Sequence, residues 1–69
     1  MVIGERIREI RINLGETMEQ FGKRFNTSKG TVNNWEKGRN FPNRENLKKI
    51  ADLSGNPKRF INSYIEQIS

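Results

Sequence analysis

Cysteine and histidine are both missing from this chain of 69 residues. Without thiols, the chain can form no disulfide bridge, zinc finger or thiol redox centre. Without imidazoles, it lacks the commonest general base and the commonest neutral metal ligand. We therefore expect no metal site and no cofactor.

Paired carboxylates and a glycine-rich phosphate loop are also missing. Glu5 and Glu9 are the one pair of carboxylates at helical spacing within a single predicted helix, and they alternate with Arg6, Arg8 and Arg11. This mixture is typical of a solvated, ion-paired helix face. The chain therefore lacks the side chains that catalysis commonly uses, and we expect that the protein is not an enzyme.

Long apolar runs do not occur either. No segment approaches the roughly 18 apolar residues of a membrane span, and the N-terminal MVIGERIREI lacks the apolar centre of a signal peptide. We expect a cytoplasmic protein with no membrane partner. The length predicts a single domain over residues 1–69 with a thin core, because a chain this short buries only roughly 60% of its unfolded surface.

Positive charge is present in excess, and it is unevenly distributed. The net charge is +5, from 13 lysines and arginines against 8 acidic residues. Residues 23–49 hold eight of these cations and only two of the acids, so the rest of the chain is slightly acidic. A basic central segment is typical of a phosphate-binding surface. The alternative is a charge excess that only keeps the protein soluble.

Helix signals begin at the N-terminus. The first segment has apolar residues at helical spacing, namely Ile3, Ile7, Ile10 and Leu14, and Gly15 follows as its C′ residue. Thr17 and Gln20 fit a capping box that opens a second helix, and Asn26 can take the left-handed conformation that ends it. A third helix is expected over residues 28–37, between an N-cap at Ser28 and Gly38.

Two more helices are expected in the C-terminal half. Pro42 interrupts the chain, and Asn43 can cap a fourth helix that ends at Gly55. Asn56 and Pro57 form an N-cap and N1 pair for a fifth. No segment alternates apolar and polar residues as a half-buried strand would. The predicted fold class is all-α, a compact bundle of five helices.

The second and third predicted helices are joined by a very short link. Only two residues separate Phe25 from Ser28, which forces a steep crossing, as in a helix-turn-helix. On a helical wheel, Val32, Trp35 and Glu36 share the inward side of the third helix. The outward side carries Lys29, Gly30, Asn33, Asn34 and Lys37.

The outward side offers chemistry suited to base edges. Asparagine can pair with adenine N6 and N7, and lysine can reach guanine O6 and N7 in a major groove wide enough for a helix. The competing interpretation treats Asn33 and Asn34 as ordinary solvated residues. Asparagine is a poor helix former, so two in succession cost stability without a return from packing.

Residues 4–61 resemble the DNA-binding domain of the lambda-repressor and Cro-type helix-turn-helix family, also called XRE-like. The matching stretches are REIRINLG, TMEQFGKRFNTSKGTVNNWEKG and RNFPNRENLKKIADLSGNPKRFI. The W-E-x-G ending followed by P-x-x-x-x-L-x-x-I-A is the specific part of the resemblance. It implies a bacterial or phage-encoded transcriptional regulator that binds a double-stranded DNA operator, usually as a dimer. The alternative is a protein-interaction module, such as an antitoxin or co-regulator, built on the same bundle.

The resemblance also implies roles for particular residues. The base-reading positions would be Lys29, Gly30, Asn33 and Asn34. The phosphate contacts would be Thr17, Met18, Ser28, Thr31, Lys37, Arg39, Asn40, Asn43 and Arg44, with Met18 standing where the family usually has a phosphate-binding glutamine. Arg11 and Glu36 match positions that form a structural ion pair.

The last predicted helix has a broad apolar face of Phe60, Ile61, Tyr64, Ile65 and Ile68. A terminal helix on so small a bundle can bury only part of such a face. We expect Ile61, Ile65 and Ile68 to form an exposed strip where a second copy binds. A homodimer, formed in solution or only on DNA, would favour an operator with inverted-repeat symmetry. The alternative is that all five side chains complete the core of a monomer.

The C-terminal sequence suits a complete Cro-like protein or the N-terminal domain of a longer regulator.

Overall fold

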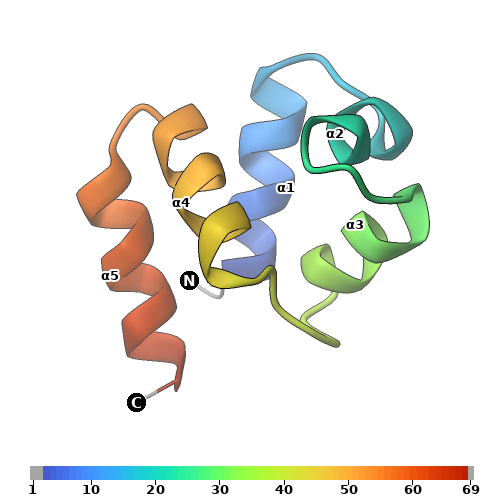
Figure 1. Ribbon diagram of the computed structural model, residues 1–69. Helices are drawn as coiled ribbons and strands as arrows, with labels where there is room; N and C mark the ends of the chain where they lie inside the picture. The colour runs from blue at the N-terminus through green and yellow to red at the C-terminus, as the bar shows by residue number, and fades with distance from the viewer. Residues whose placement is uncertain (1–2, 69) are drawn as a thin grey trace.

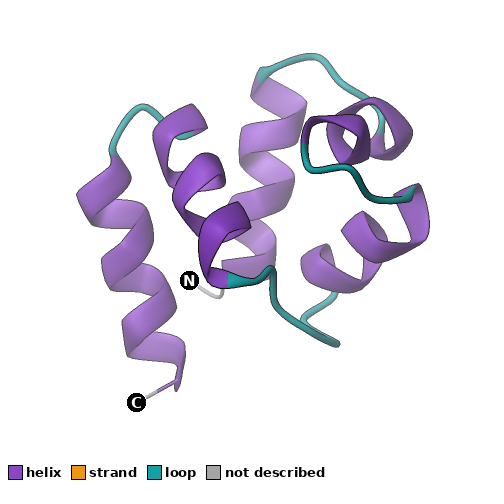
Figure 2. Ribbon diagram, viewed as in Figure 1, coloured by secondary structure: helices purple, strands orange, loops and turns teal. Residues whose placement is uncertain are grey.

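The computed structural model describes residues 3–68, and its five helices confirm the predicted all-α fold (Figure 1). The helices are α1 (Ile3–Asn13), α2 (Met18–Arg24), α3 (Lys29–Glu36), α4 (Arg44–Leu53) and α5 (Pro57–Ile68). No strand occurs in the described range, and the helices are joined only by loops and turns (Figure 2).

Helix α1 runs through the middle of the bundle. It contacts α3 on one side and α4 and α5 on the other, while α2 packs on α3 and α4 packs on α5. As a result, α5 lies at the opposite side of the molecule from α2 and α3 (Figure 1). The helix-turn-helix pair and the C-terminal helix therefore present two separate surfaces.

The core is a single cluster of buried side chains contributed by all five helices. It comprises Ile3, Ile7, Ile10, Phe21, Phe25, Val32, Trp35, Leu47, Ile50, Ala51 and Phe60. Three aromatic rings meet edge to face within it, with centroid distances of 4.9 Å from Phe21 to Phe25 and 5.7 Å from Phe25 to Trp35. The expectation that Val32 and Trp35 anchor α3 in the core is confirmed.

One apolar residue of the predicted first helix is not in the core. Leu14 lies beyond the end of α1 and is 38% exposed. The reason is the helix ending itself, because Gly15 adopts a φ of 71° and turns the chain away one residue after Leu14. Helical spacing correctly identified the buried face of α1, but the prediction wrongly included Leu14 in it.

Three helices end in the same way. At the ends of α1, α2 and α3, the residues Gly15, Asn26 and Gly38 have positive φ, at 71°, 56° and 75°. In each case the next residue donates its N–H to a carbonyl in the last turn, and the three pairs are Glu16 to Arg11, Thr27 to Gly22 and Arg39 to Asn34. These are Schellman motifs, which satisfy otherwise unpaired carbonyls and fix the direction in which the chain leaves.

Two glycines bring helices unusually close to neighbouring backbone. A β-carbon on Gly22 would lie 2.7 Å from the Thr27 carbonyl oxygen, which explains the tight turn between α2 and α3. A β-carbon on Gly4 would lie 2.5 Å from the Glu36 carbonyl oxygen and 2.7 Å from that of Trp35. Gly4 thus lets the first turn of α1 touch the last turn of α3 directly. The sequence alone gave no sign of this role of Gly4.

Within residues 3–68, no helix combines the length and the apolar character needed to cross a membrane. The same part of the chain contains no cluster of carboxylates that could hold a metal ion.

Candidate nucleic-acid interface

Helix α3 presents one buried face and one polar face. Val32 and Trp35 are buried, whereas Lys29, Gly30 and Lys37 are exposed. The side chains of Asn33 and Asn34 are half-buried, so they lie along the border of the polar face and keep part of their surface in solvent. The amides and cations of α3 are thus available together on the side away from the core.

The C-terminal end of α3 carries one further contact on this face. Arg39 follows the Schellman turn, and its backbone N–H donates to the Asn34 carbonyl oxygen at 2.9 Å. Its side chain folds back over the same residue, where Nη1 donates to Asn34 Oδ1 at 3.4 Å. A predicted phosphate-binding residue and a predicted base-reading residue are therefore in direct contact.

Helix α3 is fixed to α1 by the Arg11–Glu36 ion pair, which is present in the structure. Arg11 Nε donates to Glu36 Oε2 at 2.6 Å and Nη2 donates to Oε1 at 3.2 Å, so the pair is bidentate. The third nitrogen of Arg11 donates to the Glu16 carbonyl oxygen at 2.9 Å. The side chains are 13% and 3% exposed, respectively. Hydrogen bonding to Glu36 raises the pKa of Arg11 above its ordinary value.

Three predicted phosphate contacts occupy the N-caps of α2, α3 and α4. Thr17, Ser28 and Asn43 each accept a backbone N–H with the side-chain oxygen, from Gln20, Thr31 and Asn46 respectively. Because capping uses these atoms as acceptors, the Thr17 hydroxyl and the Asn43 amide hydrogens stay available to donate to an anion, whereas the Ser28 hydroxyl lies 3.3 Å from that of Thr31. The predicted capping box of Thr17 and Gln20 is confirmed.

A shallow cavity of about 410 Å³ lies between α3 and the loop that leads to α4. It brings together three of the predicted phosphate contacts, which are Thr31, Asn40 and Asn43. It also includes three polar residues that sequence reasoning did not select, namely Asn26, Thr27 and Asn46. Thr27 and Asn46 lie beside the N-termini of α3 and α4, where anions are favoured.

Met18 does not share the chemistry of the other predicted phosphate contacts. Its side chain is half-buried and packs against the core cluster. A thioether also has no hydrogen to donate. The Met18 side chain thus contributes packing at the start of α2, and a phosphate contact at this residue stays a prediction.

The basic central segment is partly neutralised by ion pairs. Arg24 holds Glu16 in a bidentate pair with a closest distance of 2.7 Å, and this hydrogen bonding lowers the pKa of Glu16 below its ordinary value. Lys49 lies 3.7 Å from Glu45 one turn away on α4. The cations of the α3 surface, Lys29, Lys37 and Arg39, are exposed and lie outside these pairs.

Helix α5 has an exposed apolar surface, although it is narrower than predicted. Ile65 and Ile68 are 50% and 56% exposed, whereas Ile61 is half-buried and packs against the core. Ile61 is thus less exposed than predicted, and its part in a contact with a second copy stays a prediction. The reading in which all five apolar side chains of α5 complete the core is also wrong for Ile65 and Ile68.

The exposed surface of α5 continues into a groove of about 600 Å³ between α4 and α5. Its lining is Leu47, Ile61, Tyr64 and Ile65, with Arg44 and Lys48 on the α4 side. Phe41 lies nearby, with its ring edge-to-face on Tyr64 at 5.7 Å.

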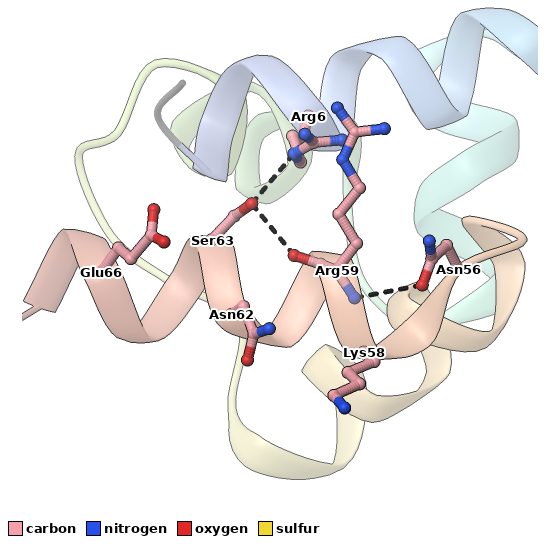
Figure 3. Close-up of a pocket in the computed structure, with 7 residues that line it drawn as sticks. All are labelled: Arg6, Asn56, Lys58, Arg59, Asn62, Ser63 and Glu66. Atoms are coloured by element: carbon pink, nitrogen blue, oxygen red, sulfur yellow. Dashed lines mark hydrogen bonds between the residues drawn. The ribbon is translucent and has the colours of Figure 1, made fainter.

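A second polar depression lies between α1 and α5, and no residue of α3 lines it (Figure 3). Three of its polar side chains serve the fold itself. Arg6 Nε donates to Ser63 Oγ at 3.0 Å, Ser63 Oγ donates to the Arg59 carbonyl oxygen at 3.1 Å, and Asn56 Oδ1 accepts the Arg59 N–H at 3.2 Å. We assign this depression to the docking of α5 on α1 and not to ligand binding.

Comparison with known families places this geometry in context. Residues 4–66 match a helix-turn-helix domain, in a family of XRE-like domains. The match covers the whole bundle from the first turn of α1 to the last turn of α5. Neither the curated proteins nor the solved structures gave a match. The match indicates a DNA-binding regulator in general, from a family that is typically not enzymatic. This chain belongs to the helix-turn-helix domain family.

Proposed function

We propose that the protein is a sequence-specific transcriptional regulator of the Cro or repressor type, bacterial or phage-encoded and cytoplasmic, which inserts α3 into the major groove of double-stranded DNA. The observation that carries the proposal is the polar face of α3, where Lys29, Asn33 and Asn34 retain solvent exposure on a helix anchored by two buried side chains. Gly30, exposed on the same face, allows close approach of the helix backbone to the groove.

The surroundings of α3 support the proposal. Hydroxyl and amide groups at Thr17, Ser28, Thr31, Asn40 and Asn43 can donate to phosphates, and helix N-termini favour anions. Lys37, Arg39 and Arg44 add positive charge around them. Phosphate contacts of this kind position a protein on DNA, whereas contacts to base edges select the sequence.

Replacement of Asn34 by alanine tests the base-reading role. Asn34→Ala should weaken binding to the best operator by about 1–3 kcal/mol and leave binding to random DNA nearly unchanged. The operator is first obtained by selection from a random DNA pool, and the affinities are then measured by fluorescence anisotropy. An unchanged sequence preference in Asn34→Ala would assign base reading to other residues of α3.

Arg44→Ala is the matched control for this measurement. Arg44 is an exposed cation at the first residue of α4, outside the α3 surface. Its loss should weaken binding to the operator and to random DNA alike. The slope of the logarithm of the binding constant against the logarithm of salt concentration should become shallower by about 1, as expected for the loss of one phosphate contact.

We further propose that the protein binds DNA as a homodimer whose contact surface includes Ile65, Ile68 and the α4–α5 groove. Two copies of α3 would need a separation of roughly 34 Å to enter successive major grooves. Each α3 would then lie roughly 17 Å from the two-fold axis. This fits a protein 29 Å in its longest extent, with α5 and α3 on opposite sides of the bundle (Figure 1).

The spacing of half-sites tests the dimer. An inverted repeat with centres about 10 base pairs apart should bind more tightly per half-site than a single half-site. Insertion of five base pairs should abolish this gain, because it rotates the second half-site to the other side of the duplex. Equal affinity per half-site in all three DNAs would mean that the chains bind independently.

A further inference from the structure

The contact between Arg39 and Asn34 limits what Asn34 can offer to a base. An asparagine amide has one acceptor oxygen and one donor NH₂ group. Since a guanidinium only donates, the oxygen must face Arg39 for the contact to be favourable, as it does in the 3.4 Å bond from Nη1 to Oδ1. The NH₂ group is then the part of Asn34 that remains to face the groove.

The position of Arg39 follows from the ending of α3. Gly38 has a φ of 75°, and the turn it makes places the Arg39 N–H on the Asn34 carbonyl oxygen at 2.9 Å. Backbone and side chain of Arg39 thus contact the same residue. Because the Schellman turn sets this proximity, it does not depend on a contact elsewhere in the molecule.

We infer that Arg39 is a specificity-determining residue, which holds Asn34 as a donor so that this pair selects guanine over adenine. Bidentate pairing of asparagine with adenine uses the amide oxygen for N6 and the NH₂ group for N7. With one lone pair of its oxygen engaged by Arg39 and a positive charge beside it, the Asn34 oxygen is a poorer acceptor for the N6 amino group, so the bond to N7 is favoured. Guanine presents two acceptors, N7 and O6, and so suits the NH₂ group of Asn34 better. This inference rests on the proposed function.

The test compares guanine and adenine at each base pair of the selected operator. For the unmodified protein, one position should prefer guanine and should lose that preference in Asn34→Ala. In Arg39→Ala the freed amide oxygen should shift the ratio of affinities at that same position toward adenine, by on the order of 5- to 150-fold. Arg39→Met, which keeps the aliphatic stem without the donors, should behave in the same way.

Two further variants separate positioning from a simple phosphate contact. Arg44→Ala, a matched loss of one arginine, should lower affinity without changing the guanine-to-adenine ratio. In the double variant Asn34→Ala and Arg39→Ala, the loss of Arg39 should no longer alter the ratio, because Arg39 acts through the Asn34 amide.

The outcomes distinguish this inference from the proposed function. If Arg39→Ala weakens binding to every sequence by the same factor, Arg39 is a phosphate contact only, and the inference is overturned while the proposed function stands. If the unmodified protein has no sequence preference at all, the proposed function fails and the inference fails with it.

Discussion

Glu36→Gln is expected to lower the free energy of unfolding by about 3 kcal/mol, the lower end of the range for breaking a buried ion pair. The change leaves the Arg11 charge without its carboxylate in a site where the two side chains are 13% and 3% exposed. The lower end applies because Arg11 retains its bond to the Glu16 carbonyl oxygen. Urea denaturation followed by circular dichroism measures the loss, which is large for a domain of this size, whose total stability is about 3–10 kcal/mol.

Glu45→Gln provides the control, because Glu45 is paired with Lys49 at 3.7 Å on the exposed surface of α4. The urea midpoint of Glu45→Gln should stay close to that of the parent, since exposed ion pairs contribute little to the free energy of unfolding. Replacing Arg11 and Glu36 together should cost less than the sum of the single changes, because no uncompensated charge remains. If Glu36→Gln unfolds no earlier than the parent, the pair has no structural role.

Gly4→Ala should destabilise the same junction between α1 and α3 by about 1–3 kcal/mol, as over-packing does elsewhere. The added β-carbon would lie 2.5 Å from one carbonyl oxygen of α3 and 2.7 Å from another, and neither can move without displacing the helix. The higher helix propensity of alanine offsets only about 1 kcal/mol of this cost. Because α3 must shift, operator affinity should fall together with the melting temperature.

Gly30→Ala is the matched control for Gly4→Ala. Gly30 also lies in a helix, but its nearest neighbour to an added β-carbon is the Ser28 hydroxyl at 3.7 Å, which is an ordinary contact. Alanine should therefore leave the fold unchanged or stabilise it by up to about 1 kcal/mol. A Gly4→Ala variant as stable as Gly30→Ala would mean that α1 and α3 can separate at no cost.

Local signals in the sequence predicted most of the fold. The N-caps Thr17, Ser28 and Asn43 and the positive-φ residues Gly15, Asn26 and Gly38 mark helix boundaries through bonds within a few residues. Such bonds depend on the local sequence, so they can be recognised before the fold is known. The inward position of Val32 and Trp35 followed from helical periodicity in the same way.

The details that escaped prediction depend on contacts between distant segments. The need for glycine at position 4 comes from carbonyls more than thirty residues away in the chain. The partial burial of Ile61 depends on how α5 packs against α4. The packing of Met18 depends on where the start of α2 meets the core cluster. The Arg39–Asn34 contact depends on the conformation of the Arg39 side chain, which a helical wheel does not show.

The central claim is that α3 and its basic surroundings bind duplex DNA and distinguish its sequence. The most direct test is titration of the unmodified protein into the selected duplex and into a random duplex of equal length over a series of salt concentrations. With Lys37, Arg39 and Arg44 near phosphates, the logarithm of the binding constant should fall with the logarithm of salt concentration with a slope of about −3 per chain. The selected duplex should bind on the order of 10³-fold more tightly than the random one. A protein that binds neither duplex at low salt, or both with equal affinity, would contradict the claim.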